Sequence, residues 1–376
     1  MRYLIAMDSF KGCLDADKVC SAVADGILQV NGTSVVTLPL ADGGEGTAAA
    51  VISALGGEIL TVPVTDPFGD TVNGYIGVVP SEDLAVIDTA SASGLGLAKA
   101  GRGNILTAST FGTGLQIVDA LDRGFSRITV GLGGSGTNDG GTGLLAALGA
   151  KFYRKDGSLI ERPCAGTLAE ISLVDLAELD PRLSKCELVY MYDVEIPLHG
   201  EHGSTKNYSP QKGADAETVE ILENAMISYA DAAQKCLGVV ANDVPGAGAA
   251  GGLGFGLFLA GAKGVNGALH MLDLCKFREL CDDADVVITG EGATDFQTAH
   301  GKLPAAVAAT AKSAGLPVIC LSGAVKPDPS LYTVGFDAMF AIPNGPITLD
   351  DSIKNAASLL RESGINIAGL ISSVTL

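Results

Sequence analysis

The sequence predicts an α/β protein in which both chain ends build a doubly wound parallel-sheet domain and a mixed α/β domain is inserted between them. Near both ends, continuous apolar strands alternate with helical patterns, which is typical of a parallel sheet covered on both faces. The middle holds short strands separated by turn residues. We place the first domain at residues 1–64 and 284–376, the inserted domain at 65–283, and the active site in the cleft between them.

The elements of the outer domain follow from apolar runs and from helical spacing. Tyr3–Met7 is an apolar run of strand length, and Asp15 precedes a helix whose apolar residues recur at helical spacing from Val19 to Val30. The other strands are expected at 34–40, 285–289, 317–321 and 336–342, and the other helices at 305–314 and 349–361.

The middle of the chain has a different pattern. Three short strands separated by turn residues suit an antiparallel meander better than β-α-β units. They are expected at 58–64, 71–79 and 84–88. A helix at 107–121 then leads into the β-branched strand Ile128–Val130, and a further short helix is expected at 144–148.

Composition narrows the classes of partner and compartment. The 376 residues carry a net charge of −19, with 47% hydrophobic and 18% charged residues, which is ordinary for a globular protein and disfavours nucleic acid and anionic membranes. The uncharged stretch Val244–Ala262 contains seven glycines, so we interpret it as a packed loop and helix rather than a membrane span. The short, early-charged N-terminus and eight scattered cysteines without a C-x-x-C motif predict a cytoplasmic protein.

The segment Gly131–Gly143 is the most informative motif. It follows a β-branched strand, interleaves seven glycines with serine, threonine, asparagine and aspartate, and leads into a helix. Glycines let the backbone approach an anion closely, and a loop before a helix offers free N–H groups, so the segment predicts phosphate binding. A tight structural turn and a dinucleotide site of the G-x-G-x-x-G type are the alternatives, and no P-loop motif is present.

Acidic residues and lysines also stand among glycines after several predicted strands. They are Asp8 and Lys11 after the first strand, Asp42 and Glu45 after the second, and Glu291, Asp295, Gln297 and Lys302 after strand 285–289. Residues just past the carboxyl ends of parallel strands line a binding crevice, so these side chains suit anion binding, Mg²⁺ and proton transfer. A purely structural role stays open for Asp42 and Glu45, as N-cap and capping-box partner of the next helix.

Taken together and in their order along the chain, these motifs resemble those of the bacterial glycerate kinase family, and the resemblance covers nearly the whole chain. The matching segments are Asp-Ser-Phe-Lys-Gly (8–12), Ala-Asp-Gly-Gly-Glu-Gly-Thr (41–47), Gly-Gly-Ser-Gly-Thr-Asn-Asp-Gly-Gly (133–141), Pro-Gln-Lys-Gly-Ala (210–214), the glycine-rich run 245–254, and Gly-Glu-Gly…Asp-x-Gln-Thr…Gly-Lys (290–302). The resemblance implies a flavodoxin-like outer domain. It also implies ATP- and Mg²⁺-dependent transfer of phosphate to D-glycerate, usually at the 2-hydroxyl to give 2-phosphoglycerate.

For such a reaction we expect a division of roles, because phosphoryl transfer needs positioning, charge neutralisation and a carboxylate near the attacking hydroxyl. Asp295 or Asp193 is expected to be the base, with Lys11 and Lys302 supplying positive charge. The ATP phosphates are expected at Gly133, Gly134, Ser135, Gly136, Thr137, Asn138 and Lys212. Mg²⁺ is expected at Asp42, Glu45 and Asp139, directly or through water, and the substrate at Asp8, Ser9 and Gln297.

The chain departs from the family pattern at positions that bear on substrate choice. Ala293 stands where the family usually has an arginine, the residue best suited to bidentate hydrogen bonding with a carboxylate or phosphate. Phe296 stands where the family usually has a glycine. The segment 193–209 differs as well. Two alternatives therefore stay open: a kinase for another small hydroxy acid, and a non-catalytic ligand-binding paralogue. The sequence also leaves open the 2- or 3-hydroxyl, the identity of the base, and a homo-oligomeric state.

Overall fold

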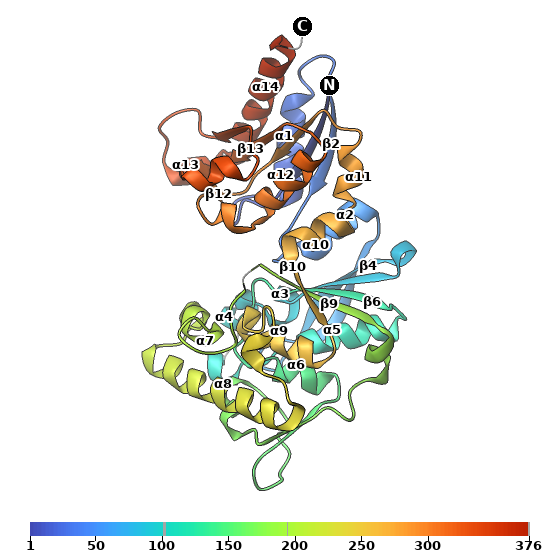
Figure 1. Ribbon diagram of the computed structural model, residues 1–376, viewed down its shortest axis with the longest axis vertical. Helices are drawn as coiled ribbons and strands as arrows, with labels where there is room; N and C mark the ends of the chain where they lie inside the picture. Colours follow the sequence, from blue (N-terminus) through green and yellow to red (C-terminus); the bar gives the residue numbers. More distant parts are fainter. Residues whose placement is uncertain (101–102, 194, 375–376) are drawn as a thin grey trace. The chain divides into compact units, whose positions relative to one another are not determined.

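A computed structural model describes residues 1–100, 103–193 and 195–374 and has the α/β architecture that the sequence predicts (Figure 1). The chain divides into two compact units. The first, which we call the terminal unit, comprises Met1–Asp42, Ala49–Gly56 and Ala268–Leu376. The second, the inserted unit, comprises Gly43–Ala48 and Gly57–Gly267.

The terminal unit contains a five-stranded sheet in which all neighbouring strands are parallel, in the order β15-β13-β11-β1-β2. Its strands are β1 (Arg2–Met7), β2 (Ser34–Pro39), β11 (Val286–Thr289), β13 (Val318–Ser322) and β15 (Ala338–Ala341), and β12 (Ala293–Thr294) pairs separately with β14 (Ala324–Val325). Numbered within this sheet alone, the order reads 2-1-3-4-5, which is the flavodoxin-like arrangement.

Seven helices belong wholly or mostly to the described part of the terminal unit. They are α1 (Ala16–Ile27), α2 (Thr47–Leu55), α10 (Gly267–Leu274), α11 (Phe277–Cys281), α12 (Leu303–Ser313), α13 (Leu349–Lys354) and α14 (Ala356–Val374). α1 lies beside α14, as Figure 1 shows, although 328 residues separate the end of α1 from the start of α14 in sequence. Val19, Val23 and Ile27 point from α1 into a core that also includes Leu360 and Ile367 of α14. The helical spacing noted in the sequence thus marks the buried face of α1.

The inserted unit contains a six-stranded mixed sheet in the order β10-β9-β6-β5-β4-β3. Its strands are β3 (Glu58–Thr65), β4 (Thr71–Val79), β5 (Leu84–Asp88), β6 (Arg127–Gly131), β9 (Glu187–Tyr192) and β10 (Lys263–Asn266), and a separate pair is formed by β7 (Lys151–Tyr153) and β8 (Leu173–Asp175). β3, β4 and β5 pair antiparallel, which confirms the predicted meander, whereas β5, β6, β9 and β10 are parallel.

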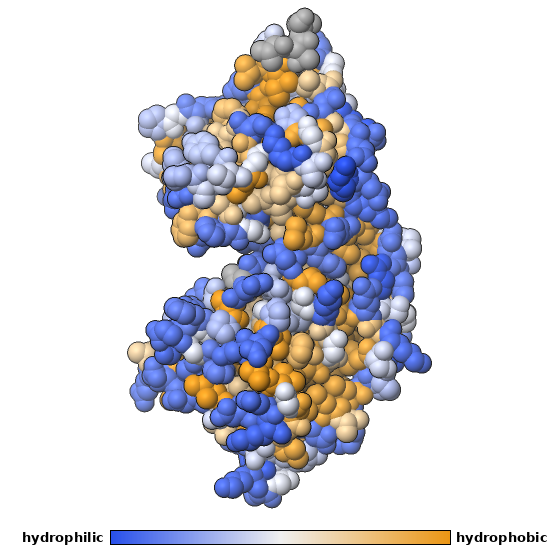
Figure 2. All heavy atoms as spheres, in the orientation of Figure 1, coloured by the Kyte–Doolittle hydropathy of each residue, from blue (hydrophilic) through white to orange (hydrophobic). Residues whose placement is uncertain are grey.

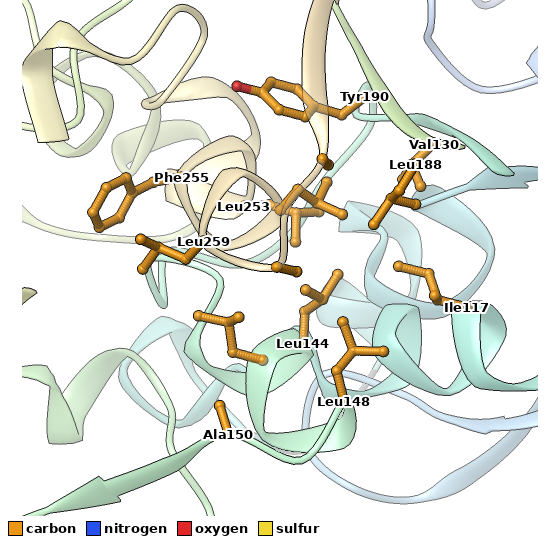
Figure 3. Close-up of a cluster of buried hydrophobic side chains, with 14 of the residues drawn as sticks. Ile117, Val130, Leu144, Leu148, Ala150, Leu188, Tyr190, Leu253, Phe255 and Leu259 are labelled. Atoms are coloured by element: carbon orange, nitrogen blue, oxygen red, sulfur yellow. The ribbon is translucent and has the colours of Figure 1, made fainter. Parts of the chain in front are cut away.

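The helices of the inserted unit cover this sheet and enclose its core. They are α3 (Ala90–Ser93), α4 (Leu95–Ala100), α5 (Phe111–Asp122), α6 (Thr142–Ala147), α7 (Ser204–Tyr208), α8 (Ala216–Leu237) and α9 (Ala249–Leu259). Figure 3 shows Ile117, Val130, Leu144, Leu188 and Leu253 packed together from α5, β6, α6, β9 and α9. Each is at most 4% exposed, and burying such a side chain stabilises the fold by about 1.5–3 kcal/mol.

The sequence pattern of α8 determines which face of this surface helix is buried. Its buried residues, including Leu222, Met226, Tyr229 and Ala233, recur at helical spacing on one face. Asp215 caps the helix by accepting a hydrogen bond from the Thr218 N–H at 2.8 Å. Hydrophilic side chains dominate the region of α8 in the view of Figure 2. None of the helices in the described residues is long and apolar enough to cross a membrane.

The unit boundaries differ from those expected from the sequence near residues 64 and 284. β3, which we placed in the outer domain, pairs with β4 along eight residues and therefore belongs to the inserted unit. Residues 268–283, which we placed in the inserted domain, group with the terminal unit. A strand pattern identifies a strand but not its partner, and in this chain the partner decides the boundary.

Candidate active site

The terminal sheet has a topological switch point at β1, because β2 lies on one side of it and β11 on the other. In open α/β sheets, ligands bind beyond the carboxyl ends of the strands at such a point. Asp8 directly follows β1, and Gly290 and Glu291 directly follow β11. The Asp8 N–H donates to the Gly290 carbonyl at 3.1 Å, which joins the two strand ends.

Asp8 is a buried carboxylate at this switch point, and only 7% of the residue is exposed. Its Oδ1 accepts a hydrogen bond from the Ser9 N–H at 2.6 Å. Burial and the neighbouring carboxylates of Asp42 and Glu291 raise the pKa of Asp8 to about 7, although Lys11 opposes this rise. Lys11 Nζ lies 3.8 Å from Asp42 Oδ2, so the lysine predicted to supply positive charge lies beside a predicted Mg²⁺ ligand.

Glu291 is a second buried carboxylate of the terminal unit, and polar side chains contact it. Its Oε1 accepts from the Thr298 hydroxyl at 2.5 Å, and its Oε2 lies 3.6 Å from Lys302 Nζ. Burial raises the pKa of Glu291. The Asp295 side chain accepts from the Gln297 N–H at 3.0 Å, and the Gln297 residue is exposed. The structure thus brings Lys302 to Glu291, a residue to which the sequence assigned no specific role.

The glycine-rich loop follows β6 in the inserted unit, and several of its N–H groups hold the loop itself in place. Gly133 N–H donates to the Gly43 carbonyl at 2.9 Å, and Gly136 N–H donates to the Ser93 carbonyl at 2.8 Å. Among the described residues, no partner accepts from the N–H groups of Gly134, Ser135, Thr137 and Asn138. The N–H groups of Gly133 and Gly136 are thus already bonded within the protein, and phosphate binding at this loop stays a prediction.

The second glycine run, 245–254, packs directly against this loop. Gly140 N–H donates to the Gly251 carbonyl at 3.0 Å, and a Cβ on Gly251 would overlap the Thr137 carbonyl. Ala250, Gly251 and Gly252 all have positive φ, which interrupts helical geometry inside α9. The glycines of this run therefore allow close packing against the glycine-rich loop.

Lys212 reaches the glycine-rich loop from a short 3₁₀ turn, Pro210–Lys212. Its ammonium donates to the Ser135 hydroxyl at 2.9 Å and to the Thr137 carbonyl at 2.8 Å. Burial lowers the pKa of Lys212 to about 7, and the charge of Asp139 acts in the opposite direction. The residue is only partly buried as a whole, but its charged end is surrounded by protein. A bound anion would stabilise the ammonium form.

Two further side chains of the loop have buried oxygen atoms without a partner among the described residues. They are Thr137 Oγ1 and Asn138 Oδ1, and both residues are completely buried. Asn138 Nδ2 donates to the Thr205 hydroxyl at 3.1 Å, which fixes the orientation of the amide. An unpaired buried polar atom is costly, so these two atoms are available to a ligand or to ordered water.

The buried side chain of Asp139 fixes the glycine-rich loop through hydrogen bonds. Its Oδ2 accepts from the Thr110 N–H at 2.7 Å, the Thr110 hydroxyl at 2.9 Å and the Gly143 N–H at 3.1 Å, and its Oδ1 accepts from the Gly141 N–H at 3.2 Å. The residue is completely buried, and burial raises its pKa. Both oxygens of Asp139 thus accept hydrogen bonds that hold the loop in place. The role of Asp139 at Mg²⁺, directly or through water, stays a prediction.

An Asp139→Asn variant is expected to lower the free energy of unfolding by about 2–4 kcal/mol, because the amide nitrogen replaces an oxygen that accepts buried hydrogen bonds. Urea unfolding measures the effect. Asp119→Asn is the control, because Asp119 of α5 forms an ion pair with Arg123, the residue after the helix, and such pairs contribute about 0.5 kcal/mol. Equal stabilities of the two variants would refute the loop-holding role.

The other predicted metal ligands belong to different units. Asp42 lies in the terminal unit, and Glu45 is exposed in the inserted unit. Within residues 1–100, 103–193 and 195–374, no group of three or more histidine, cysteine, aspartate or glutamate residues could hold a metal ion. The Mg²⁺ site at Asp42 and Glu45 stays a prediction. So does the location of the active site in a cleft between the domains.

Asp193, one of the two candidate bases, is exposed after β9 in the inserted unit. Burial raises the pKa of Tyr208, and the charge of Asp193 adds to this rise. Asp295 lies in the terminal unit, so the two candidates belong to different units. The choice between them stays a prediction.

The sequence analysis missed Asp88, the last residue of β5. Its carboxylate accepts from the Gly46 N–H and the Ala48 N–H, both at 3.0 Å, at the start of α2. The distant Asp88 thus caps this helix, a role that we had considered for Asp42 and Glu45. The signal was available, because Asp88 ends an apolar strand as Asp8 follows one.

Known proteins are similar to this chain in sequence and in architecture. The glycerate kinase family matches residues 3–372. A glycerate kinase of Bacillus subtilis is 41% identical over 374 residues (99% of this chain, 98% of the relative), and a glycerate 2-kinase of Escherichia coli is 38% identical over 374 residues (99% and 98%). A crystal structure assigned as glycerate kinase 2, from Salmonella typhimurium LT2, matches with a TM-score of 0.88 at 38% identity over 100% of this chain and 99% of that one. The chain therefore belongs to the glycerate kinase family.

Proposed function

We propose that this protein transfers the terminal phosphate of Mg·ATP to D-glycerate, on the 2-hydroxyl, and releases 2-phosphoglycerate and ADP. Membership of the glycerate kinase family supports the reaction class and the substrate. The name of the Escherichia coli relative, glycerate 2-kinase, supports the position of transfer.

The observation that carries the proposal is the arrangement of Lys212 on the glycine-rich loop. One buried ammonium binds Ser135 Oγ and the Thr137 carbonyl beside four backbone N–H groups that have no partner in the described residues. Backbone N–H groups with an adjacent lysine are the usual means of holding the phosphates of a nucleotide. The unpaired Thr137 Oγ1 and Asn138 Oδ1 add further polar atoms to the same loop.

The terminal unit supplies the groups suited to a hydroxy acid. Lys11 and Lys302 carry the positive charge that a carboxylate substrate needs, and Ser9 and Gln297 supply polar atoms at the same strand ends. Mg²⁺, held by Asp42 and Glu45, would neutralise phosphate charge during transfer. The carboxylate oxygens of these two residues are the ligand type that Mg²⁺ prefers.

The chain offers three carboxylates that could take the proton of the attacking hydroxyl. Asp295 and Asp193 are the two expected from the sequence. Asp8 joins them, because its pKa is raised to about 7 by burial and by Asp42, and a base whose pKa lies near the working pH is the most effective. The turnover of the three Asp→Asn variants identifies which of these carboxylates is the base.

A kinase for another small hydroxy acid is the second candidate function. This candidate rests on Ala293, which is exposed in β12 and cannot form the bidentate hydrogen bonds that an arginine forms with a carboxylate. Turnover of Mg·ATP with D-glycerate and with a panel of other hydroxy acids separates the two candidates. Preference for another acid would replace D-glycerate as the substrate, and binding of ATP without turnover would favour the non-catalytic paralogue.

A further inference from the structure

Asp88 is a buried carboxylate that binds a segment distant in sequence. Only 1% of the residue is exposed, and its two oxygens accept from the Gly46 and Ala48 N–H groups, each at 3.0 Å. A third donor, the Tyr75 hydroxyl on β4, contacts Oδ2 at 3.0 Å. Three donors from two separate parts of the chain thus converge on one side chain.

The segment that Asp88 binds, Gly43–Ala48, is joined in turn to the glycine-rich loop. The Gly43 carbonyl accepts the Gly133 N–H at 2.9 Å, and a Cβ on Gly133 would overlap Gly44 Cα. The segment groups with the inserted unit, whereas the residues on either side of it group with the terminal unit. Hydrogen bonds to Asp88 and Gly133 therefore join this short stretch to the rest of the inserted unit.

A neutral residue could cap the start of α2, and the chain uses a buried charge instead. Serine, threonine or asparagine caps helices well and carries no charge to desolvate. Burial raises the pKa of Asp88 to about 6, so ionisation of this side chain carries an energetic penalty. A charged acceptor binds its donors more strongly and more directionally than a neutral one, which suits a segment that must be held in one geometry.

We propose that Asp88, oriented by Tyr75, is a positioning residue that fixes Gly43–Ala48, and through Gly43 the glycine-rich loop, in the geometry that phosphoryl transfer requires. The functional part of this inference rests on the proposed kinase activity. Asp88 touches neither substrate nor phosphate in this scheme. It acts through Glu45, which the segment carries, and through Gly133.

Three variants test the inference. Asp88→Asn removes the charge and one acceptor, and Tyr75→Phe removes the third donor but leaves the carboxylate, which keeps the test possible if Asp88→Asn does not fold. Asp66→Asn is the matched control. Asp66 is also a buried carboxylate of the inserted unit and accepts two backbone N–H groups, from Phe68 at 2.8 Å and from Asp70 at 3.0 Å, but it holds only the turn between β3 and β4.

Amide hydrogen exchange in peptides covering 43–48 reports the anchoring without any reference to activity. We expect faster exchange there in Asp88→Asn and Tyr75→Phe and no change in Asp66→Asn. In kinetics with Mg·ATP, we expect kcat/KM for ATP to fall about 10²-fold in Asp88→Asn and less in Tyr75→Phe, with a higher half-saturating Mg²⁺ concentration. Asp66→Asn should stay within about twofold of wild type, although its thermal stability falls similarly.

Each departure from this pattern has a distinct meaning. Unchanged exchange at 43–48 in both Asp88→Asn and Tyr75→Phe would overturn the anchoring. Faster exchange with unchanged kinetics, or kinetics that merely follow thermal stability as in Asp66→Asn, would overturn the positioning role. If the wild-type protein turns over no hydroxy acid, the proposed function and the positioning role both fall, while faster exchange still supports the anchoring.

Discussion

A Lys212→Met variant is expected to lose about 10²–10³-fold in kcat/KM for ATP while it folds at least as well as the wild type. Methionine keeps the length of the side chain but removes the ammonium that contacts Ser135 Oγ and the Thr137 carbonyl. Phosphates would then meet the loop without an adjacent positive charge. Stability should not suffer, because the variant removes a desolvated charge from the inserted unit.

Lys206→Met is the control for this variant. Lys206 lies six residues earlier and pairs with Glu201 at 3.1 Å, where its contribution is that of a surface ion pair. Calorimetric titration with Mg·ATP should show weakened binding for Lys212→Met only. Equal affinities of the two variants for ATP would remove Lys212 from phosphate binding.

The same lysine predicts a pH dependence in the wild type. Burial lowers the pKa of Lys212 to about 7, so the free protein loses this charge as the pH rises above that value. A bound phosphate favours the ammonium and raises its pKa, so ATP binding takes up a proton. The KM for ATP should therefore rise by up to about tenfold per pH unit above pH ~7, and Lys212→Met should lose this dependence. A wild-type KM that is constant from about pH 6 to about pH 9 would contradict the assignment.

Asp8→Asn is expected to increase the free energy of unfolding by about 1–3 kcal/mol at pH ~8 and, if Asp8 is the base among the three candidate carboxylates, to reduce kcat by about 10²-fold or more. Asparagine keeps the acceptor for the Ser9 N–H but removes a charge that lies buried near Asp42 and Glu291. Stability and activity would change in opposite directions, which is the behaviour of a group retained for function.

The sign of the stability effect follows from the direction of the pKa shift. Burial and Asp42 raise the pKa of Asp8 to about 7 in the folded protein, whereas an unfolded aspartate titrates near pH ~3.9. The folded state thus binds the extra proton between these values, and its stability falls as the pH rises through them. The gain of Asp8→Asn should be complete above pH ~7 and absent below pH ~4. A gain of the same size at acid pH would contradict this explanation.

Asp295→Asn and Asp193→Asn complete the comparison and identify the base. Neither carboxylate is fully buried, so both variants should fold like the wild type. The variant of the true base should lose about 10²-fold or more in kcat, and the other two should lose less. If Asp8→Asn retains wild-type turnover, Asp8 is a structural carboxylate and the base is one of the other two residues.

The fold class could be predicted from the sequence because its signals are local. Apolar runs such as Tyr3–Met7 and the helical spacing of α1 depend on neighbouring residues, and the turns around β4 marked the antiparallel meander. The unit boundaries could not be predicted in the same way. β3 belongs with β4 because of a ladder of hydrogen bonds, and residues 268–283 belong with the terminal unit because of packing.

In the candidate site, too, the features with local signals could be predicted and those that depend on long-range contacts could not. The strand-end rule predicted that Asp8, Lys11 and Asp42 lie near one another, because a parallel sheet brings carboxyl ends to one edge, and in the structure they do. It could not show that Asp139 is enclosed by Thr110, which lies 29 residues away in sequence. Asp88 escaped notice because we weighted acids that stand among glycines, whereas Asp88 ends a strand without a glycine beside it.

The prediction for Lys212 came from the family motif, and its contacts with the glycine-rich loop are visible only in the structure. The lysine reaches Ser135 across 77 residues of sequence, so no local pattern links the two. The contact with the Thr137 carbonyl depends on the path of the loop, which the packing of Gly251 helps to fix. Long-range contacts of this kind require the folded chain.

Product identification by phosphorus NMR, in a reaction of purified protein with Mg·ATP and D-glycerate, tests the central proposal most directly. We predict that ADP and 2-phosphoglycerate accumulate in equal amounts and that chelation of Mg²⁺ stops the reaction. Formation of 3-phosphoglycerate would contradict the proposed position of transfer. Folded protein that binds ATP but forms no phosphorylated glycerate would contradict the proposed function itself.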